Sequence, residues 1–222
     1  MIDTKFVESS ILEKFPFKHA LIGKCISEEN RQKLLEDMPD DNYYRSVREG
    51  GSDKTYNVVN NILLKLGEKK FNKDSNLSEC WINLVNSLQS KQYIQALSNV
   101  LQENLLDCYQ EVTLKIYGGG DFISPHTDKA DVKATHMIFL NETWSNEWGG
   151  NLCLLSDADS VCKKIIPTID NTLAFVRSDN SWHSVEEIKN MQAERIALQV
   201  VFWNVDKRYT LAGRIEDTVI RK

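Results

Sequence analysis

The sequence predicts a mainly β fold of the α+β type, in which helices are concentrated in the first hundred residues. After residue 110, short runs rich in β-branched and aromatic residues alternate with turn residues, and several such strands are typical of a barrel or sandwich. Before residue 110, apolar residues recur at helical spacing, which indicates helices that bury one face. The expected strands cover residues 112–117, 135–140, 148–155, 172–176 and 195–203.

The N-terminal region carries recognisable helix signals. Ser27 precedes Glu28 and Glu29, so it can cap a helix whose first turn is acidic. Apolar stripes later in the region usually face a core, and we expect them to brace one face of the β structure. In chain order we expect a strand at 20–26, a helix at 27–36, a polar loop at 40–52, a helix at 58–66, a polar loop at 68–78, and helices at 81–88 and 93–101.

Length and composition indicate a single globular unit. A chain of 222 residues can bury one substantial core, and 41% hydrophobic with 27% charged residues is ordinary for a globular protein. We expect one domain, with a largely helical elaboration at 1–108, a β core at 109–210 and a C-terminal tail at 211–222.

Charge and cysteine usage narrow the possible partners and compartment. A net charge of −5 and a pI near 5.5 argue against a protein that follows a phosphate backbone, so no nucleic-acid partner is expected. The sequence contains no run of about 18 apolar residues, so no membrane span is expected. The N-terminus lacks a basic region followed by an apolar stretch, so no secretory signal is expected. Five scattered cysteines without a C-x-x-C pair are typical of reduced thiols in a cytoplasm.

Three residues form a candidate metal site. His126 and Asp128 are two positions apart, and His183 follows in a later segment. In an extended chain, residues i and i+2 point to the same side, so one segment can supply two ligands and a later strand the third. Two histidines and one carboxylate are the facial triad that holds Fe(II) and leaves the opposite face open.

The alternative interpretation is structural. An isolated H-x-D is more often an ordinary surface pair, and His183 could be a core histidine with satisfied hydrogen bonds. The order of the strands around the three residues favours the metal site. The other two histidines are expected to be structural: His19 lies far from the motif, and His136 has odd parity to Phe139, so it faces the other side of its strand.

Residues 112–203 resemble the core of the Fe(II)- and 2-oxoglutarate-dependent dioxygenases, on the prolyl-4-hydroxylase-like branch. The resemblance covers somewhat less than half of the chain, and it implies a double-stranded β-helix, a jelly-roll barrel with the iron at its open end. The matching pieces are Tyr117, the H-x-D at 126–128, Phe139-Leu-Asn141, Gly149-Gly-Asn-Leu152, Trp182-His183 and Arg195.

The resemblance also implies an anchor for the cosubstrate. In this family a basic residue after the second histidine binds the carboxylate of 2-oxoglutarate that does not touch the metal, and Arg195 stands there. A guanidinium suits this role because it is always charged and can form two parallel hydrogen bonds. Two departures are a longer turn at 188–194 and Phe139, where some relatives carry a tyrosine. Tyr117 is therefore expected to be the second donor.

Residues next to the triad are candidates for substrate binding. Arg177, Asn180 and Trp182 precede His183 and combine a cation, an amide and an aromatic ring. Arg45 and Arg48 lie in the loop expected at 40–52 and could close over the substrate. The alternatives are that residues 179–180 merely form a turn, and that the loop at 40–52 is simply solvated.

The function implied by the resemblance is an Fe(II)- and 2-oxoglutarate-dependent dioxygenase that consumes O2 and releases succinate and CO2. We expect hydroxylation of an unactivated C–H bond in an amino acid, a peptide or a related small metabolite. Desaturation or cyclisation uses the same ligands and stays open, whereas Asp128 argues against halogenation, because halogenating relatives lack that carboxylate. A non-redox metal-binding barrel and a non-catalytic interaction scaffold are the alternatives outside this class. The oligomeric state is not predicted.

Overall fold

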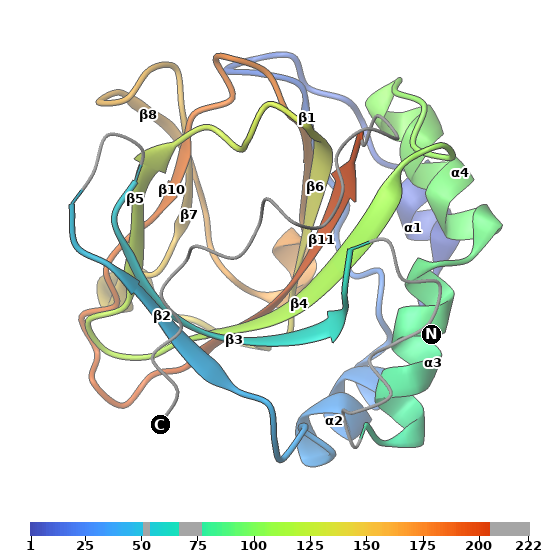
Figure 1. Cartoon of the computed structure of the whole chain (residues 1–222), viewed down its shortest axis with the longest axis horizontal. Coiled ribbons are helices and arrows are strands. Elements are labelled where there is room, and N and C mark those ends of the chain that lie inside the picture. Colours follow the sequence, from blue (N-terminus) through green and yellow to red (C-terminus); the bar gives the residue numbers. More distant parts are fainter. Residues whose placement is uncertain (51–53, 67–76, 205–222) are drawn as a thin grey trace.

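The protein is built on one antiparallel sheet that curls into a jelly-roll barrel (Figure 1). The computed structural model describes residues 1–50, 54–66 and 77–204. The strand order is β1-β9-β6-β11-β4-β3-β5-β10-β7-β8, and β2 pairs with β3. The strands are β1 His19–Leu21, β2 Tyr44–Arg48, β3 Tyr56–Leu64, β4 Tyr109–Tyr117, β5 Phe122–His126, β6 Val132–Phe139, β7 Leu152–Leu155, β8 Val161–Ile165, β9 Leu173–Val176, β10 His183–Val185 and β11 Arg195–Trp203.

The long strands β4, β6 and β11 form the centre of the sheet, and their side chains alternate between two faces. On β4, Val112 and Leu114 enter the core that the helices cover, whereas Tyr117 enters the core inside the barrel. Because successive residues on a strand point to opposite faces, Thr113 and Lys115 share the inner face with Tyr117. The central strands therefore separate an outer, helix-covered face from the barrel interior.

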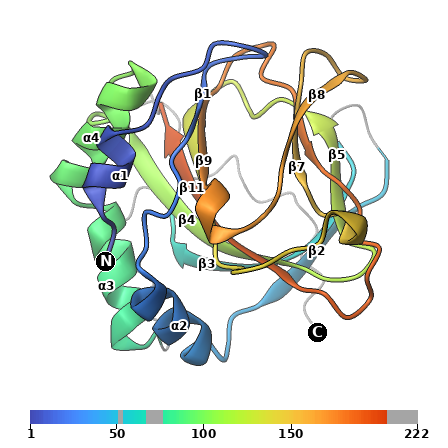
Figure 2. The same ribbon diagram turned by 180° about the vertical axis from the view of Figure 1, so that it is seen from behind.

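Four helices cover the outer face on one side of the barrel (Figures 1 and 2). They are α1 Thr4–Glu8, α2 Glu28–Glu36, α3 Glu79–Leu88 and α4 Lys91–Leu101. Ser27 caps α2 by accepting a hydrogen bond from the backbone N–H of Asn30, as its position predicts. The fully buried Trp81 of α3 donates its indole N–H to the carbonyl of Leu34 at 3.1 Å, which ties α3 to α2. The expected bracing by helices is confirmed.

Two expectations for the N-terminal region are wrong. The helix expected at 58–66 is not formed: residues 58–64 belong to β3, which pairs with β2 and β4. The expected loop at 40–52 contains β2. The physical reason is that a strand buried on both faces shows no clean alternation, so its apolar residues can mimic helical spacing, and pairing with a central strand decides the outcome. Most of the expected loop at 68–78 lies outside the described residues.

The other expected elements are present with shifted boundaries. The expected strand at 148–155 begins only at Leu152, after a short 3-10 turn at Asn146–Trp148 (η1), and the one at 20–26 shrinks to β1. A second 3-10 turn, Ile169–Asn171 (η2), precedes β9. Among the described residues, no helix is both long and apolar enough to cross a membrane. All five cysteines are free thiols.

The turn after β4 is closed by another part of the chain. The backbone N–H of Gly120 donates to the carbonyl of Ile188 at 2.8 Å, and the N–H of Ile188 donates to the carbonyl of Asp121. A Cβ on Gly119 would lie 2.6 Å from the Cα of Met191, so this close approach requires a glycine. The long connection between β10 and β11 is therefore packed against the glycine-rich turn.

Candidate metal and cosubstrate site

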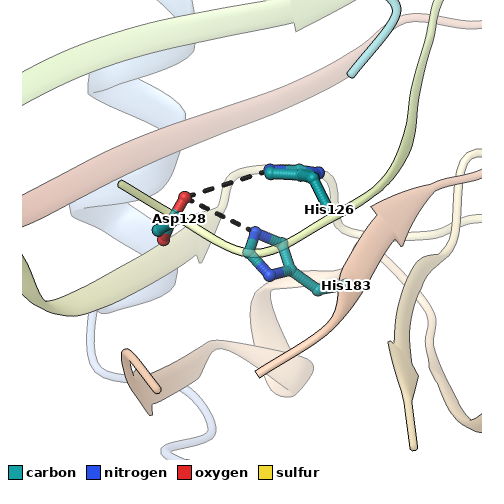
Figure 3. A group of neighbouring side chains, drawn as sticks. All are labelled: His126, Asp128 and His183. Carbon is teal, nitrogen blue, oxygen red and sulfur yellow. Dashed lines mark ion pairs between the residues drawn. The ribbon is translucent and has the colours of Figure 1, made fainter. Parts of the chain in front are cut away.

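The three predicted ligands come together at one corner of the barrel, where β5 meets β10 (Figure 3). His126 is the last residue of β5 and His183 the first of β10, and the two are register partners across the antiparallel pair. Their ring centroids are 4.2 Å apart. Asp128 lies two residues after His126, in the connection to β6, so a strand end and the turn that follows supply two of the three side chains.

We call His126, Asp128 and His183 the triad. Their ligand atoms converge on one point. One ligand atom from each residue lies within 4.8 Å of the others. The Oδ1 atom of Asp128 is 3.9 Å from Nε2 of His126 and 3.7 Å from Nε2 of His183 (Figure 3). Both histidines are buried, at 4% and 6% exposure. The spacing leaves room for one ion between two imidazole nitrogens and a carboxylate oxygen.

Neighbouring groups hold each triad residue in place. Nδ1 of His126 lies 2.9 Å from the carbonyl of Ser124, and Nδ1 of His183 lies 3.0 Å from the carbonyl of Ser181. A proton on each Nδ1 satisfies these carbonyls and leaves the Nε2 lone pairs for a metal. Thr135 of β6 donates its hydroxyl to Oδ2 of Asp128 at 2.9 Å, so Oδ1 is the oxygen that faces the histidines.

The electrostatics of the corner keep the histidines neutral. Burial lowers the pKa of His126 well below its usual value, and the nearby His183 and Lys54 lower it further. Burial also lowers the pKa of His183, against the opposing effect of Asp128. A metal ligand must be unprotonated, so both side chains are in the form that binds a cation.

Arg195 occupies the barrel interior without a partner for its charge. It is fully buried at the start of β11, opposite Tyr117 of β4. Its guanidinium carbon lies 4.7 Å from the ring centre of Tyr117 and 4.9 Å from that of Phe139. Among the described residues its three nitrogens have no hydrogen-bond acceptor of good geometry, and burial lowers its pKa against the opposing effect of the Tyr117 hydroxyl. An unpaired buried cation is costly, so this arrangement is suited to receive an anion.

Arg195 and the triad belong to the same interior. Tyr117 and Phe139, which flank the guanidinium, are part of an apolar cluster that also contains Phe175. The ring of Phe175 lies 4.7 Å from that of His183. One continuous interior therefore joins the buried cation to the triad.

The segment before His183 supports the triad and turns the chain. The Nε of Arg177 donates to the backbone carbonyl of Asp128 at 3.2 Å, and its Nη1 pairs with the exposed Asp179 at 2.7 Å. The hydroxyl of Ser178 donates to the side-chain oxygen of Asn180 within this exposed turn. Trp182 is half-buried. Arg177 is thus adjacent to the triad, whereas Asn180 is engaged in the turn.

The two candidate arginines of β2 point to opposite sides. The Nη1 atom of Arg45 pairs with Asp121 at 2.6 Å and also donates to Asn57 at 2.7 Å. Arg48 is opposite Tyr56, whose side chain packs on the apolar cluster inside the barrel. Because alternate residues on a strand share a face, Arg48 belongs to the interior face and Arg45 to the other. The structure does not bring these arginines together.

Sequence reasoning missed Thr135 and Lys115. Thr135 donates a hydrogen bond to Asp128. The only sequence signal for this role is its even spacing from Phe139, which places both side chains on the same face of the strand. Lys115 lies two residues before Tyr117 and therefore on the same inner face. A cation at an inward position of a buried strand is unusual, and that was the available signal.

The side chains present fit a metal and an anionic cosubstrate. Two neutral imidazoles and one carboxylate are the donor set of a facial Fe(II) site that leaves coordination positions open. The buried guanidinium of Arg195, with no acceptor for its donors, is complementary to a carboxylate. Arg195, with the Tyr117 hydroxyl beside it, could hold the far end of a dicarboxylate whose other end lies at the triad.

Comparisons with known proteins agree with this geometry. Residues 112–203 match the family model described as the 2OG-Fe(II) oxygenase superfamily. Among solved structures, prolyl 4-hydroxylases from Phytophthora capsici are similar, with a TM-score of 0.62 and 19% identity over 96% of this chain and 72% of that chain. A prolyl hydroxylase from Trichoplax adhaerens, in complex with a fragment of hypoxia inducible factor, has a TM-score of 0.59 and 17% identity over 84% and 83% of the two chains.

A 2OG-Fe(II) oxygenase family protein from Burkholderia pseudomallei is similar at a TM-score of 0.56 and 13% identity, over 81% of this chain and 80% of that chain. No curated protein sequence matches the chain. At these identities the structural likeness shows the fold, a jelly roll, and the family model covers the barrel core alone. Members of that family use Fe(II), 2-oxoglutarate and O2. Residues 112–203, the barrel core and less than half of this chain, are thus similar in sequence to the 2OG-Fe(II) oxygenase superfamily.

Proposed function

We propose that this protein is an Fe(II)- and 2-oxoglutarate-dependent dioxygenase that hydroxylates an unactivated C–H bond. The single observation that carries the proposal is the combination, within one barrel, of a convergent triad and a buried guanidinium without a partner. Either feature alone has a structural explanation. Together they provide the two attachment points that a metal-chelating dicarboxylate requires.

In this proposal His126, Asp128 and His183 hold the metal, and Arg195 with Tyr117 holds the cosubstrate. When bound, Fe(II) with 2-oxoglutarate and O2 supplies the oxidation of a substrate C–H bond, with release of succinate and CO2. The backbone carbonyls of Ser124 and Ser181 fix the two imidazoles. Arg195 orients the cosubstrate through a charge-assisted pair that the apolar rings around it shield from water.

We further propose that the substrate is an amino acid, a peptide or a related small metabolite. The fold of the prolyl hydroxylases, one of which is complexed with a peptide fragment, supports this class by analogy. Arg177, which contacts the triad, and Arg48, on the interior face of β2, are the favoured contacts, and Trp182 stays a candidate as the neighbour of His183. Arg45 and Asn180 are less favoured because each is engaged elsewhere. The five free thiols fit a reducing cytoplasm, which would also keep iron in its Fe(II) state.

Two measurements test the proposal. Protein purified without oxygen should bind one Fe(II) per chain and then bind 2-oxoglutarate, and air should cause slow formation of succinate. A screen of amino acids, peptides and small metabolites, read by succinate release and product mass, should then find a compound that accelerates turnover and gains one oxygen atom. Binding of metal without 2-oxoglutarate would favour a non-redox metal site, and binding of neither would favour a non-catalytic scaffold.

A further inference from the structure

Lys115 is a cation on the inner face of the barrel that the proposed mechanism does not use. It lies on β4 between Thr113 and Tyr117, and the alternate residues Val112 and Leu114 fill the helix-covered core instead. Its neighbour across β11 is Ala197, a small residue. The lysine side chain therefore extends into the interior that contains Arg195 and the triad, and part of it remains accessible.

The ammonium of Lys115 is held by a neutral partner. Its Nζ donates to Oδ1 of Asn60 at 2.8 Å, and the amide of Asn60 donates in turn to the hydroxyl of Ser46 at 3.0 Å. An ammonium has three protons, and among the residues that the structure describes no carboxylate lies within ion-pair distance of it. Asn60 therefore orients the ammonium of Lys115 but carries no charge that would neutralise it.

Four charged groups act on Lys115 from the surrounding elements. Burial lowers its pKa to about 8, and Lys54 of the segment before β3 and Arg195 of β11 act in the same direction. Glu111 on β4 and Asp128 of the triad act in the opposite direction. At neutral pH the side chain therefore remains mostly protonated, and it lies within electrostatic reach of both the triad and Arg195.

Charge balance indicates what Lys115 faces when the site is filled. In the proposed complex, the two charges of Fe(II) and the charge of Arg195 are matched by Asp128 and the two carboxylates of 2-oxoglutarate. Of the remaining charged groups around Lys115, its own ammonium and that of Lys54 are positive and only Glu111 is negative, so one positive charge is left in a low-dielectric interior, where an unmatched charge is unfavourable. An anion that enters after the cosubstrate would relieve that cost.

Resting on the proposed function, we infer that Lys115 binds a carboxylate of the substrate itself, so that the preferred substrates are acids rather than their neutral amides. The inward position on β4, the aim set by Asn60 and the proximity to Asp128 support this role. The other carboxylate source is 2-oxoglutarate, which already has Arg195 for one end and the metal for the other. The experiment below distinguishes these two sources.

The test uses Mn(II) in place of Fe(II), with saturating 2-oxoglutarate at pH 7, so that no turnover occurs. Acetate is the probe, and acetamide is its neutral match. Paramagnetic relaxation of the acetate methyl protons should show saturable binding near the metal in the wild type, with little effect on acetamide. Lys115→Met keeps the length and removes the charge, and it should weaken acetate binding by roughly tenfold or more. Lys115→Arg should retain binding.

Lys164→Met is the matched control, because Lys164 is a 56% exposed cation on β8 that pairs with Glu186. It should behave as the wild type. Thermal melting shows whether each variant is folded. Equal acetate relaxation in the wild type and in Lys115→Met would overturn the inference, and so would the absence of acetate binding in the wild type. A loss of 2-oxoglutarate affinity in Lys115→Met would assign the lysine to the cosubstrate. If the wild type binds neither Mn(II) nor 2-oxoglutarate, the proposed function itself fails.

Discussion

The two faces of the central sheet treat polar side chains in opposite ways, and adjacent residues of β6 show the contrast. Thr135 points into the barrel and donates a hydrogen bond to Asp128 of the triad. His136 points to the helices, where its Nδ1 lies 2.6 Å from the hydroxyl of Tyr93 of α4 and its Nε2 has no partner. The polar groups of the interior leave their ligand atoms available, whereas on the outer face His136 forms a neutral pair with Tyr93 inside an apolar core.

The role of a buried histidine in this protein depends on the face of the sheet that it occupies. His136 is fully buried in an apolar core, and burial lowers its pKa to about 3. His126 and His183 are also buried and neutral, but their Nε2 atoms converge with a carboxylate oxygen. The same neutral imidazole is a structural group in one place and a potential metal ligand in the other. The following predictions test this contrast.

The largest effect is expected from the triad. Replacing His126 or Asp128 by Ala removes one of three ligands, so iron binding and 2-oxoglutarate turnover should be abolished. The fold should persist, because removing these side chains leaves the helix-covered core intact. Succinate release and iron content measure the first effect, and thermal melting the second. Normal turnover in either variant would contradict the assignment of the metal site.

The second effect concerns Arg195. Replacing it by Met removes a buried cation that has no partner in the unliganded protein, so the unliganded variant should be at least as stable as the wild type. The affinity for 2-oxoglutarate should fall by roughly tenfold or more, since losing one partner of a buried charge pair costs about 2–5 kcal/mol. Calorimetric titration into metal-loaded protein is the measurement. Unchanged affinity would place the anchor elsewhere, and iron binding should be retained.

The third effect concerns acid stability. The pKa of His136 is about 3 in the folded protein and near 6.5 when unfolded, so the unfolded chain binds more protons between these values. Stability from this group is present above pH 6.5 and decreases as the pH falls toward 3, by at most about 1.4 kcal/mol per pH unit. Denaturant unfolding of His136→Leu between pH 7 and 4 should show a shallower pH dependence than the wild type. An identical slope would contradict the lowered pKa.

The fourth effect isolates the outer face. Tyr93→Phe removes the hydroxyl that contacts His136 and leaves a buried imidazole without a partner. The free energy of unfolding should fall by about 1–3 kcal/mol, while 2-oxoglutarate affinity stays unchanged. Denaturant unfolding and titration of the same sample provide both values. A change in cosubstrate affinity would show that the two faces are coupled.

The smallest effect is expected from Arg45. Its pair with Asp121 is partly exposed on the arginine side, so Arg45→Ala should cost no more than about 1 kcal/mol of stability. Substrate-stimulated turnover should remain at the wild-type level, because the side chain leaves β2 on the face away from the interior. Arg177→Ala is the comparison: it removes the contact with the Asp128 carbonyl and should lower iron affinity. Impaired substrate kinetics in Arg45→Ala would restore its predicted role.

Features set by residues close together in the sequence were predictable, whereas features set by contacts between distant residues were not. The triad was predictable because two of its members are neighbours in sequence and all three have the residue types of a known donor set. The helices α2, α3 and α4 were predictable from caps and periodicity, which are local signals. The strands β2 and β3 were not, because β2 pairs with β3, and β3 in turn pairs with β4, some fifty residues later in the sequence. Lys115 was missed for the same reason: its significance depends on Asn60 and Asp128, which only the fold brings near it.

The packed contact between the glycine-rich turn and residues 188–191 joins the turn after β4 to the segment before β11. Backbone hydrogen bonds from Gly120 and Ile188 hold the ends of the strands that carry Tyr117 and Arg195. The guanidinium of Arg195 packs against the rings of Tyr117 and Phe139, so we expect it to keep its position along the barrel. If the distance between the triad and the guanidinium is fixed in this way, the site should select a dicarboxylate by its length, and 2-oxoadipate, one methylene longer than 2-oxoglutarate, should compete poorly. Gly119→Ala would displace Met191 and should weaken this selectivity for length.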